Sequence, residues 1–349
     1  MKKVISLVLS VMMMLTMFAG CKASGTAETA APTAAPTSAT TAETAADTTT
    51  PAAQEFNVAI VQQLDHASLD EIRTAIVAQL QAQAEEKGVK VNIQEFNGQN
   101  DATVLNQIGA QVVGDGVDLI IPIATLAAQC MVTAADGTDI PIVYAAISDP
   151  EAAGLTGLGN VTGTSDALNT AFILDMMLAA NPDIKTVGLL YSNSEANSAT
   201  PIAEAKAYLK EKQIDFVEKT GNTSGEIVEA AASMVGRVDA VFTPTDNVVM
   251  AAEVTVAETL NEAGIPHYTG ADSFVAAGAF ATCGVNYTEL GTYTADMAMD
   301  ILLGGAVPEF HVMDGGIITV NTETAAALGI DYSAFASMAN TVVEVKTGE

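Results

Sequence analysis

Tryptophan is absent from the chain, arginine occurs only at Arg73 and Arg237, and basic residues are few. Lys and Arg together number 13 against 42 Asp and Glu, which gives a formal net charge of −29. A chain this acidic has no electrostatic attraction to nucleic acid or to anionic lipid. Because the guanidinium fork is a preferred partner of phosphate-like anions, the scarcity of arginine also argues against a phosphate or sulfate ligand.

Cysteine and histidine are equally sparse, with three residues of each type. Cys130 and Cys283 are distant in sequence and lack the spacing of a metal site, so they form either a disulfide or two buried thiols. His66, His267 and His311 are scattered, and none has a carboxylate or cysteine at ligand spacing. We therefore expect neither a metal site nor a cofactor.

The first twenty residues have the layout of an export signal. Two lysines precede an apolar run over residues 4–18, which has the length of a signal-peptide core and is short for a bilayer-spanning helix. The run ends in the letters FAG directly before Cys21, which resembles the bacterial lipobox, although Phe18 stands where leucine is usual. We expect residues 1–20 to be a lipoprotein signal peptide and Cys21 to be lipidated; ordinary secretion with a chance cysteine is the alternative.

The next segment, residues 21–54, follows Cys21 with Ala, Thr, Pro and Ser and almost no large apolar side chain. Such a stretch cannot bury enough surface to offset the entropy of ordering it, so it is predicted to be a disordered tether. Residues 55–349 are globular in composition and long enough for two domains of ordinary size.

Apolar strands and amphipathic helices alternate through this globular part. One series of strands is expected at 56–63, 89–96, 118–123 and 140–147, and a second at 186–192, 214–219, 240–243 and 266–269. The intervening helices include one that starts with a capping box of Ser68 and Glu71, one capped by Asp101, and one over 247–263. Later in the chain a helix is expected at about 289–303 and a short strand at 317–320.

Two such series predict an α/β fold with two similar lobes, each built on a parallel sheet with helices on both faces. The first lobe is expected to comprise residues 55–163 with about 284–312. The second lobe is expected to comprise 164–283 with about 313–349, so that more than one strand joins the lobes.

Polar residues stand directly after many of the predicted strands, where ligands lie in open α/β sheets. Each could simply cap the following helix, but together they aim polar groups from both lobes at one cleft. The candidate ligand-binding residues are Gln63, Thr125, Ser148, Asp149, Asp166, Asn193, Glu195, Asn197, Asp246, Asn247 and Asp272. Within this set, Asn197 is equally well explained as a helix cap, and Asp166 as a brace of the hinge.

Several segments make the chain similar to a known family. They are VQQLDHASLD at 61–70, ATLAAQ at 124–129, ISDPEAAGL at 147–155, GNVTGTSD at 159–166, TVGLLYSNSEANS at 186–198 and TPTDNVV at 243–249. Together they resemble substrate-binding proteins of bacterial ABC transporters, in the group typified by tryptophan- and tyrosine-binding members. The chain departs from this group at Ala124, where glycine is usual, and at Leu126, where proline is usual.

The resemblance implies a type I periplasmic-binding fold of two Rossmann-like lobes joined by three crossover strands. It also implies that Thr125, the backbone of Ala146 and Ser148 hold the carboxylate of an amino-acid ligand. Asp272 or Asp246 would hold the ammonium group, because an ionised carboxylate is an acceptor-only partner. The ligand would then draw the two lobes together.

The implied function is delivery of a small amino acid, with an aromatic one as a candidate, to an ABC permease and its ATPase. The protein would be a monomer, held to the outer face of the cytoplasmic membrane by its lipid alone. A sugar or nucleoside receptor of the same fold is one alternative, although sugar sites usually need the aromatic rings and arginines that are scarce here. A sensor domain is another. An enzyme is not expected, because no serine stands in a strand–elbow–helix motif.

Overall fold

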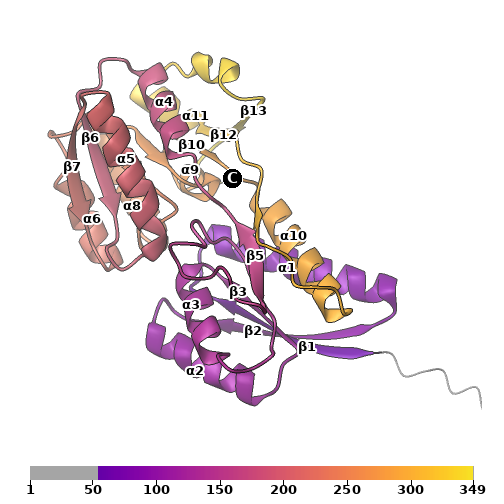
Figure 1. Ribbon diagram of the computed structural model, residues 1–349. Coiled ribbons are helices and arrows are strands. Elements are labelled where there is room, and N and C mark those ends of the chain that lie inside the picture. The colour runs from indigo at the N-terminus through magenta and orange to yellow at the C-terminus, as the bar shows by residue number, and fades with distance from the viewer. Residues whose placement is uncertain (1–53, 349) are drawn as a thin grey trace, which may run out of the picture. The chain divides into compact units, whose positions relative to one another are not determined.

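The computed structural model describes residues 54–348, which form two β-sheets flanked by helices (Figure 1). The predicted signal peptide, the lipidation of Cys21 and nearly all of the predicted tether lie outside the described residues. None of the helices in residues 54–348 is long and apolar enough to cross a membrane.

The first sheet has six parallel strands in the order β11-β5-β4-β3-β1-β2. Its strands are β1 (Glu55–Gln62), β2 (Lys90–Asn97), β3 (Leu119–Ile123), β4 (Ile142–Tyr144), β5 (Val161–Ser165) and β11 (His311–Val312). Its helices are α1 (Ala67–Lys87), α2 (Ala102–Gly114), α3 (Thr125–Ala134) and α10 (Tyr287–Leu302).

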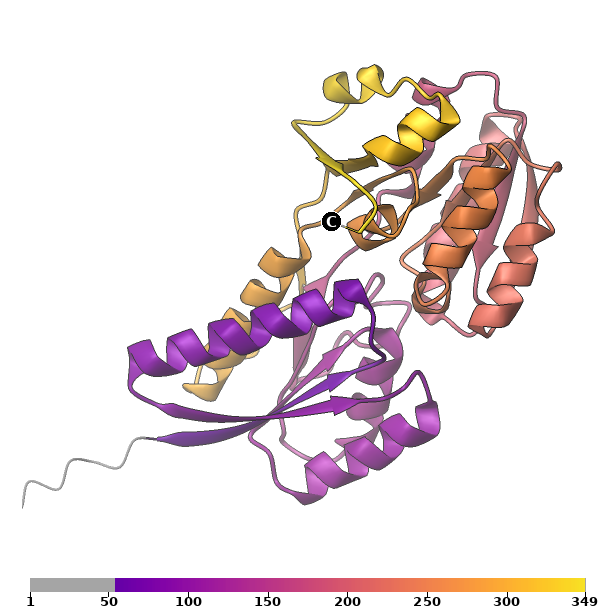
Figure 2. The same ribbon diagram turned by 180° about the vertical axis from the view of Figure 1, so that it is seen from behind.

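Helices cover both faces of this sheet because successive side chains of a strand point to opposite faces. Val58 and Ile60 of β1 are fully buried in the core that includes α1 and α10, whereas Ala59 and Val61 are buried in the core that includes α2 and α3. The helices α1 and α10 lie side by side, as Figure 2 shows from behind. Gly291 permits this close approach, since a Cβ there would lie 2.6 Å from the carbonyl oxygen of Ile72.

The second sheet has seven strands in the order β13-β12-β10-β9-β8-β6-β7. Its strands are β6 (Thr186–Tyr191), β7 (Asp215–Thr220), β8 (Ala240–Thr243), β9 (His267–Thr269), β10 (Ala281–Gly284), β12 (Ile317–Asn321) and β13 (Thr341–Val345). Its helices are α4 (Thr170–Ala180), α5 (Ala199–Glu211), α6 (Ser224–Ala232), α7 (Asn247–Met250), α8 (Glu253–Glu262), α9 (Asp272–Ala276) and α11 (Thr322–Leu328).

The described chain passes between the two sheets three times, after β5, after β10 and after β11. Strand β5 leads to α4 beside the second sheet, β10 leads back to α10, and β11 leads to β12. The division into lobes at 55–163 with 284–312 and 164–283 with 313–349 remains our proposal.

Several local predictions were wrong. The capping box does not form: α1 begins at Ala67, its N-cap His66 makes no side-chain cap, and the Ser68 hydroxyl is hydrogen-bonded to that of Ser273. The single helix expected over 247–263 is divided into α7 and α8. The second sheet is not wholly parallel, because β10 and β12 pair antiparallel. By contrast, Asp101 caps α2 as predicted.

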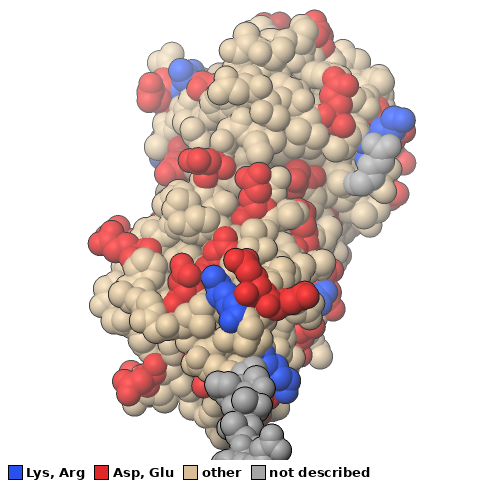
Figure 3. All heavy atoms as spheres, turned by 90° about the vertical axis from the view of Figure 1, so that its right-hand side faces the viewer, with Lys and Arg blue, Asp and Glu red and all other residues tan. Residues whose placement is uncertain are grey.

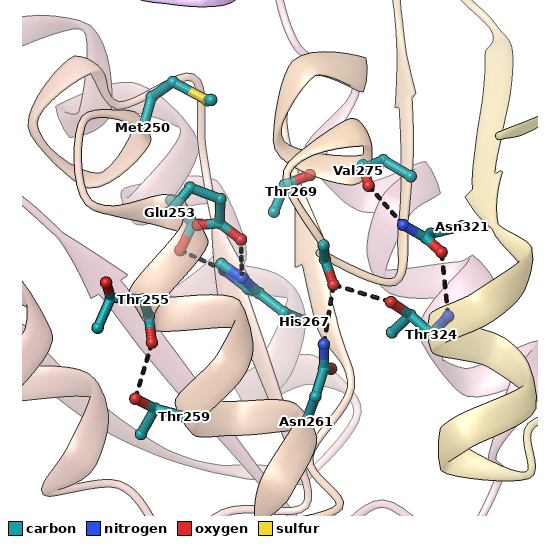
Figure 4. A network of polar contacts seen from close by, with 12 residues as sticks. Met250, Glu253, Thr255, Thr259, Asn261, His267, Thr269, Val275, Asn321 and Thr324 are labelled. Carbon is teal, nitrogen blue, oxygen red and sulfur yellow. Dashed lines mark hydrogen bonds and ion pairs between the residues drawn. The ribbon is translucent and has the colours of Figure 1, made fainter. Parts of the chain in front are cut away.

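Polar side chains form a network inside the second sheet's layer, seen close by in Figure 4. His267 of β9 and Glu253 of α8 are almost wholly buried, and the His267 Nδ1 atom lies 3.0 Å from a carboxylate oxygen of Glu253. The His267 Nε2 atom lies 2.8 Å from the Thr243 hydroxyl. Because no side chain of this trio is exposed, the network ties helix to sheet rather than meeting a ligand.

Cys130 and Cys283 are both buried free thiols, so of the two alternatives, a disulfide or two buried thiols, the second is correct.

Figure 3 shows acidic side chains scattered over one face of the molecule with few basic ones between them. On that face the acidic excess is therefore a solvated surface.

Candidate functional site

A cavity lies where the carboxyl ends of strands from the two sheets meet. Segments after β1, β3, β4 and β5 supply one side, and segments after β6, β8, β9 and β10 supply the other. The lining residues are His66, Ser68, Leu69, Ala124, Thr125, Ala146, Ser148, Asp166, Asn197, Thr245, Asp246, Asn247, Met250, Ala271, Phe274 and Tyr287. This is the placement that the fold class favours for ligands.

Of the twelve predicted site residues, the structure brings seven to this cavity. They are Thr125, Ala146, Ser148, Asp166, Asn197, Asp246 and Asn247. Asn197 is not a helix cap, because its amide donates instead to the carbonyl oxygen of Thr245 at 2.7 Å. That these seven residues bind a ligand remains a prediction.

The other five predicted residues do not line the cavity. Gln63 and Glu195 lie behind its wall and are bonded to each other, as described below. Asp149 accepts from the Thr200 hydroxyl at 2.7 Å, and the exposed Asn193 donates to Thr220 at 2.9 Å. Asp272 heads α9, and its Oδ1 atom is buried without a hydrogen-bond partner in the described part of the chain.

The carboxylate of Asp246 is already saturated by protein donors. Its Oδ1 atom accepts from the backbone N–H groups of Val248 and Val249, which makes Asp246 the N-cap of α7. Its Oδ2 atom accepts from the backbone N–H of Ser192 at 2.7 Å and from the Ser198 hydroxyl at 2.6 Å. Since a carboxylate offers about four acceptor positions, little capacity is left for a ligand.

Asp166 is the carboxylate in the cavity that keeps spare capacity. Its Oδ1 atom accepts from the Ser148 hydroxyl at 3.0 Å and its Oδ2 atom from the Tyr287 hydroxyl at 3.1 Å. Burial raises the pKa of Asp166, although these two hydrogen bonds oppose the rise. A cationic ligand group beside it would stabilise the ionised form further.

Glu195 connects the two sides of the cleft behind the cavity wall. Its Oε1 atom accepts from the Gln63 side chain at 3.0 Å, and its Oε2 atom accepts from Asn247 at 2.6 Å. Gln63 in turn accepts from the backbone N–H of Leu126 at 3.0 Å. Burial, together with the nearby charge of Asp246, raises the pKa of Glu195 to about 7.

Two alanines that line the cavity adopt backbone conformations that alanine rarely takes. Ala124, just before α3, has φ 74° and ψ 162°, and Ala146 has φ 57°. The conformation of Ala124 turns the chain sharply from β3 into α3, so that the start of a ten-residue helix faces the cavity. The N-terminus of a helix favours an anionic group through its free N–H groups and its dipole.

Sequence reasoning missed part of the lining. Ser68, Leu69, Met250, Phe274 and Tyr287 were not among the candidates. Tyr287 had a usable signal, because it follows the end of β10 as the other candidates follow their strands. The apolar members carried none, since a leucine, methionine or phenylalanine at helical spacing reads as ordinary core.

Comparison with known proteins assigns the fold to a family. Residues 57–343 match the family model described as ABC transporter substrate binding protein. A curated relative from Clostridioides difficile (strain R20291), named tyrosine-binding protein, is 33% identical over 286 residues, which cover 80% of this chain and 82% of the relative.

Solved structures of similar proteins share the architecture. The ABC domain in complex with L-Trp from Streptococcus pneumonia superposes with a TM-score of 0.77 at 30% identity, covering 83% of this chain and 100% of that one. The ligand-free, open structure of a substrate-binding protein with adhesive properties from Clostridium difficile has a TM-score of 0.63 at 33% identity, covering 84% and 99%.

Hydrogen bonds join the two sides of the cleft in this chain, among them Ser148 to Thr245 at 3.0 Å and Gln63 to Glu195 at 3.0 Å. With its type I periplasmic-binding fold and its cleft between two sheets, the chain belongs to the family of ABC transporter substrate-binding proteins.

Proposed function

We propose that the cleft binds a small α-amino acid, with its ammonium group on Asp166 and its carboxylate at the start of α3. The observation that carries this proposal is the contrast between the two acids in the cavity. Asp246 is fully engaged by protein donors from four other groups, whereas each oxygen of Asp166 accepts from a single side-chain hydroxyl. An ammonium group needs such an acceptor-only partner with free lone pairs.

The carboxylate of the ligand is placed against Thr125 and the backbones of Ala146 and Ser148, because the Ser148 hydroxyl donates its one proton to Asp166. All three line the cavity, and Thr125 is the first residue of α3, so the helix N-terminus adds favourable charge. Asp272 heads another short helix but does not line the cavity, which makes it a weaker candidate for the ammonium group than Asp166.

The side chain of the ligand is placed against an apolar wall. Leu69, Met250 and Phe274 line the same cavity. Such a wall favours a large apolar or aromatic side chain over a hydroxyl-rich ring. The similar proteins support this reading, because one is named for tyrosine and another was solved with L-Trp.

The setting of the protein follows from its family and its N-terminal sequence. We propose that residues 1–20 are removed on export, that Cys21 carries lipid, and that residues 21–54 tether the folded part to the outer face of the cytoplasmic membrane. The partners are the permease and ATPase of an ABC importer. The protein acts as a monomer without catalysing a reaction.

Thermal unfolding of the full-length chain in detergent tests the proposal against the twenty amino acids, several sugars and several nucleosides. Binding to the folded state raises the midpoint by linkage, so we expect an amino acid with an aromatic side chain to raise it most. If a sugar raises the midpoint and no amino acid does, the proposed function is wrong.

Asp166→Asn then tests the placement of the ammonium group. Loss of a charge-assisted hydrogen bond is expected to weaken binding of that amino acid by roughly 10- to 100-fold. Asp272→Asn is the matched control and should leave the affinity nearly unchanged. The reverse result would move the ammonium group to Asp272.

A further inference from the structure

His66 lines the ligand cavity and has a ring nitrogen without a hydrogen-bond partner in the described chain. The residue follows β1 and lines the cavity. Its Nε2 atom lies 3.0 Å from the Oδ1 atom of Asn247, which comes from the opposite side of the cleft. Its Nδ1 atom is buried and has no hydrogen-bond partner among residues 54–348. A buried polar atom of this kind requires a partner, which a bound ligand can supply.

The surrounding network decides which ring nitrogen carries the proton. Glu195 accepts hydrogen bonds from the side-chain amides of both Gln63 and Asn247. The side-chain nitrogen of Asn247 faces Glu195, and its Oδ1 atom faces the Nε2 atom of His66. Because an amide oxygen only accepts hydrogen bonds, the His66 Nε2 atom is the donor in this contact.

The remaining nitrogen of His66 is then a bare acceptor. Burial lowers the pKa of His66, which favours the neutral ring, although Asn247 and the charges of Asp65 and Asp70 oppose this shift. A neutral ring with its proton on Nε2 leaves a lone pair on Nδ1. The lone pair has no partner in the described chain and is open to an incoming donor.

We propose that the Nδ1 atom of His66 accepts a hydrogen bond from an O–H or N–H group in the side chain of the bound amino acid, and so selects ligands that carry such a donor. The inference rests on the proposed function. The ammonium group is not the expected donor, because a carboxylate in the same cavity, Asp166, is the stronger partner for a cation.

A hydrogen bond of this kind distinguishes between aromatic amino acids. Tyrosine offers a phenolic O–H and tryptophan an indole N–H, whereas phenylalanine offers no side-chain donor. Binding of phenylalanine would leave the His66 acceptor buried and unsatisfied, which is costly even when the apolar contacts are the same. The two ligands named for the similar proteins are both of the donor-bearing kind.

Calorimetric titration of the full-length chain with L-tyrosine, L-tryptophan and L-phenylalanine tests the inference. For the wild type we expect tyrosine, tryptophan or both to bind at least roughly tenfold tighter than phenylalanine. In His66→Phe the donor-bearing ligand should lose that advantage, while phenylalanine binding changes little or improves. His311→Phe is the matched control, because His311 stacks on Tyr293 outside the cavity, and the preference should survive there.

Nitrogen NMR of the ring provides a measurement that needs no cavity variant. The chain has three histidines, and His66 should show a neutral ring protonated on Nε2. Its Nδ1 resonance should shift on addition of the preferred donor-bearing ligand and not on addition of phenylalanine.

The outcomes separate the two proposals. If the wild type binds none of the three amino acids, nor any other, the proposed function fails and the inference with it. If the wild type binds phenylalanine as tightly as both others, or if His66→Phe weakens all three equally, the amino-acid function stands and the inference about His66 is overturned. A proton on Nδ1 in the wild type would overturn it as well.

Discussion

Replacing Ala124 by glycine should stabilise the folded protein. The backbone of Ala124, at φ 74° and ψ 162°, lies in a region that is nearly exclusive to glycine, because a Cβ there meets the neighbouring peptide groups. The cost of holding alanine in this region is about 3 kcal/mol, the upper end for sparsely populated conformations. The family resemblance already pointed to this position, where glycine is usual.

Two smaller effects oppose the gain. Ala124 is 4% exposed, so removing its methyl group costs about 0.8 kcal/mol of burial. Glycine also has more freedom in the unfolded chain, which costs about 0.4–1 kcal/mol. The balance predicts that Ala124→Gly raises the free energy of unfolding by about 1–2 kcal/mol.

Urea unfolding of the full-length chain without ligand, followed by circular dichroism, measures this balance. Ala127→Gly is the matched control, because Ala127 is buried in the regular part of α3. Glycine there should lower the stability by about 1 kcal/mol or more, through helix propensity and the lost methyl group. If Ala124→Gly is destabilising to the same extent as the control, the strain assigned to Ala124 does not exist.

Two further predictions concern buried ionisable groups. His267→Leu leaves the carboxylate of Glu253 buried without its partner and should lower the free energy of unfolding by about 3–5 kcal/mol. The double variant His267→Leu with Glu253→Leu should recover most of this loss. Equal stability of the single variant and the wild type would contradict this prediction. Burial, followed by the charge of Glu71, raises the pKa of Asp272 from 3.8 to about 6, so the folded state holds this proton more tightly than the unfolded state does. The free energy of unfolding of the wild type, relative to that of Asp272→Asn, should therefore be greatest below pH 4. This difference should fall by on the order of 2–3 kcal/mol as the pH rises to about 6. If urea titrations show a constant difference over that range, the raised pKa of Asp272 is refuted.

The fold could be read from the sequence wherever strands were continuous and apolar. The alternation through residue 269 predicted strands of both sheets, because Val58 to Val61 and similar runs are buried on two faces. The elements that follow α10 were harder to predict. Strand β11 has two residues and α11 has seven, and neither is long enough to show a period. The antiparallel pairing of β10 with β12 depends on the chain's return path, which local patterns do not encode.

The site could be predicted only in outline, for a related reason. The rule that ligands lie beyond strand ends found Thr125, Ser148 and Asp166 because their residue types are polar. It could not separate Asp246 from Asp166, since that distinction depends on which backbone N–H groups each carboxylate meets in space. The same holds for His66, whose meaning comes from the orientation of Asn247 across the cleft.

The three passages of the chain between the sheets restrict how the two halves of the molecule can move. Three parallel connections oppose sliding and separation of the two halves. We therefore expect the halves to move mainly by rotation about one axis through the three crossings. Asp166 follows the first crossing strand and Tyr287 follows the second, and the hydrogen bond between them at 3.1 Å couples the two. A ligand that contacts either residue therefore acts on the axis of this rotation as well as on the sides of the cleft.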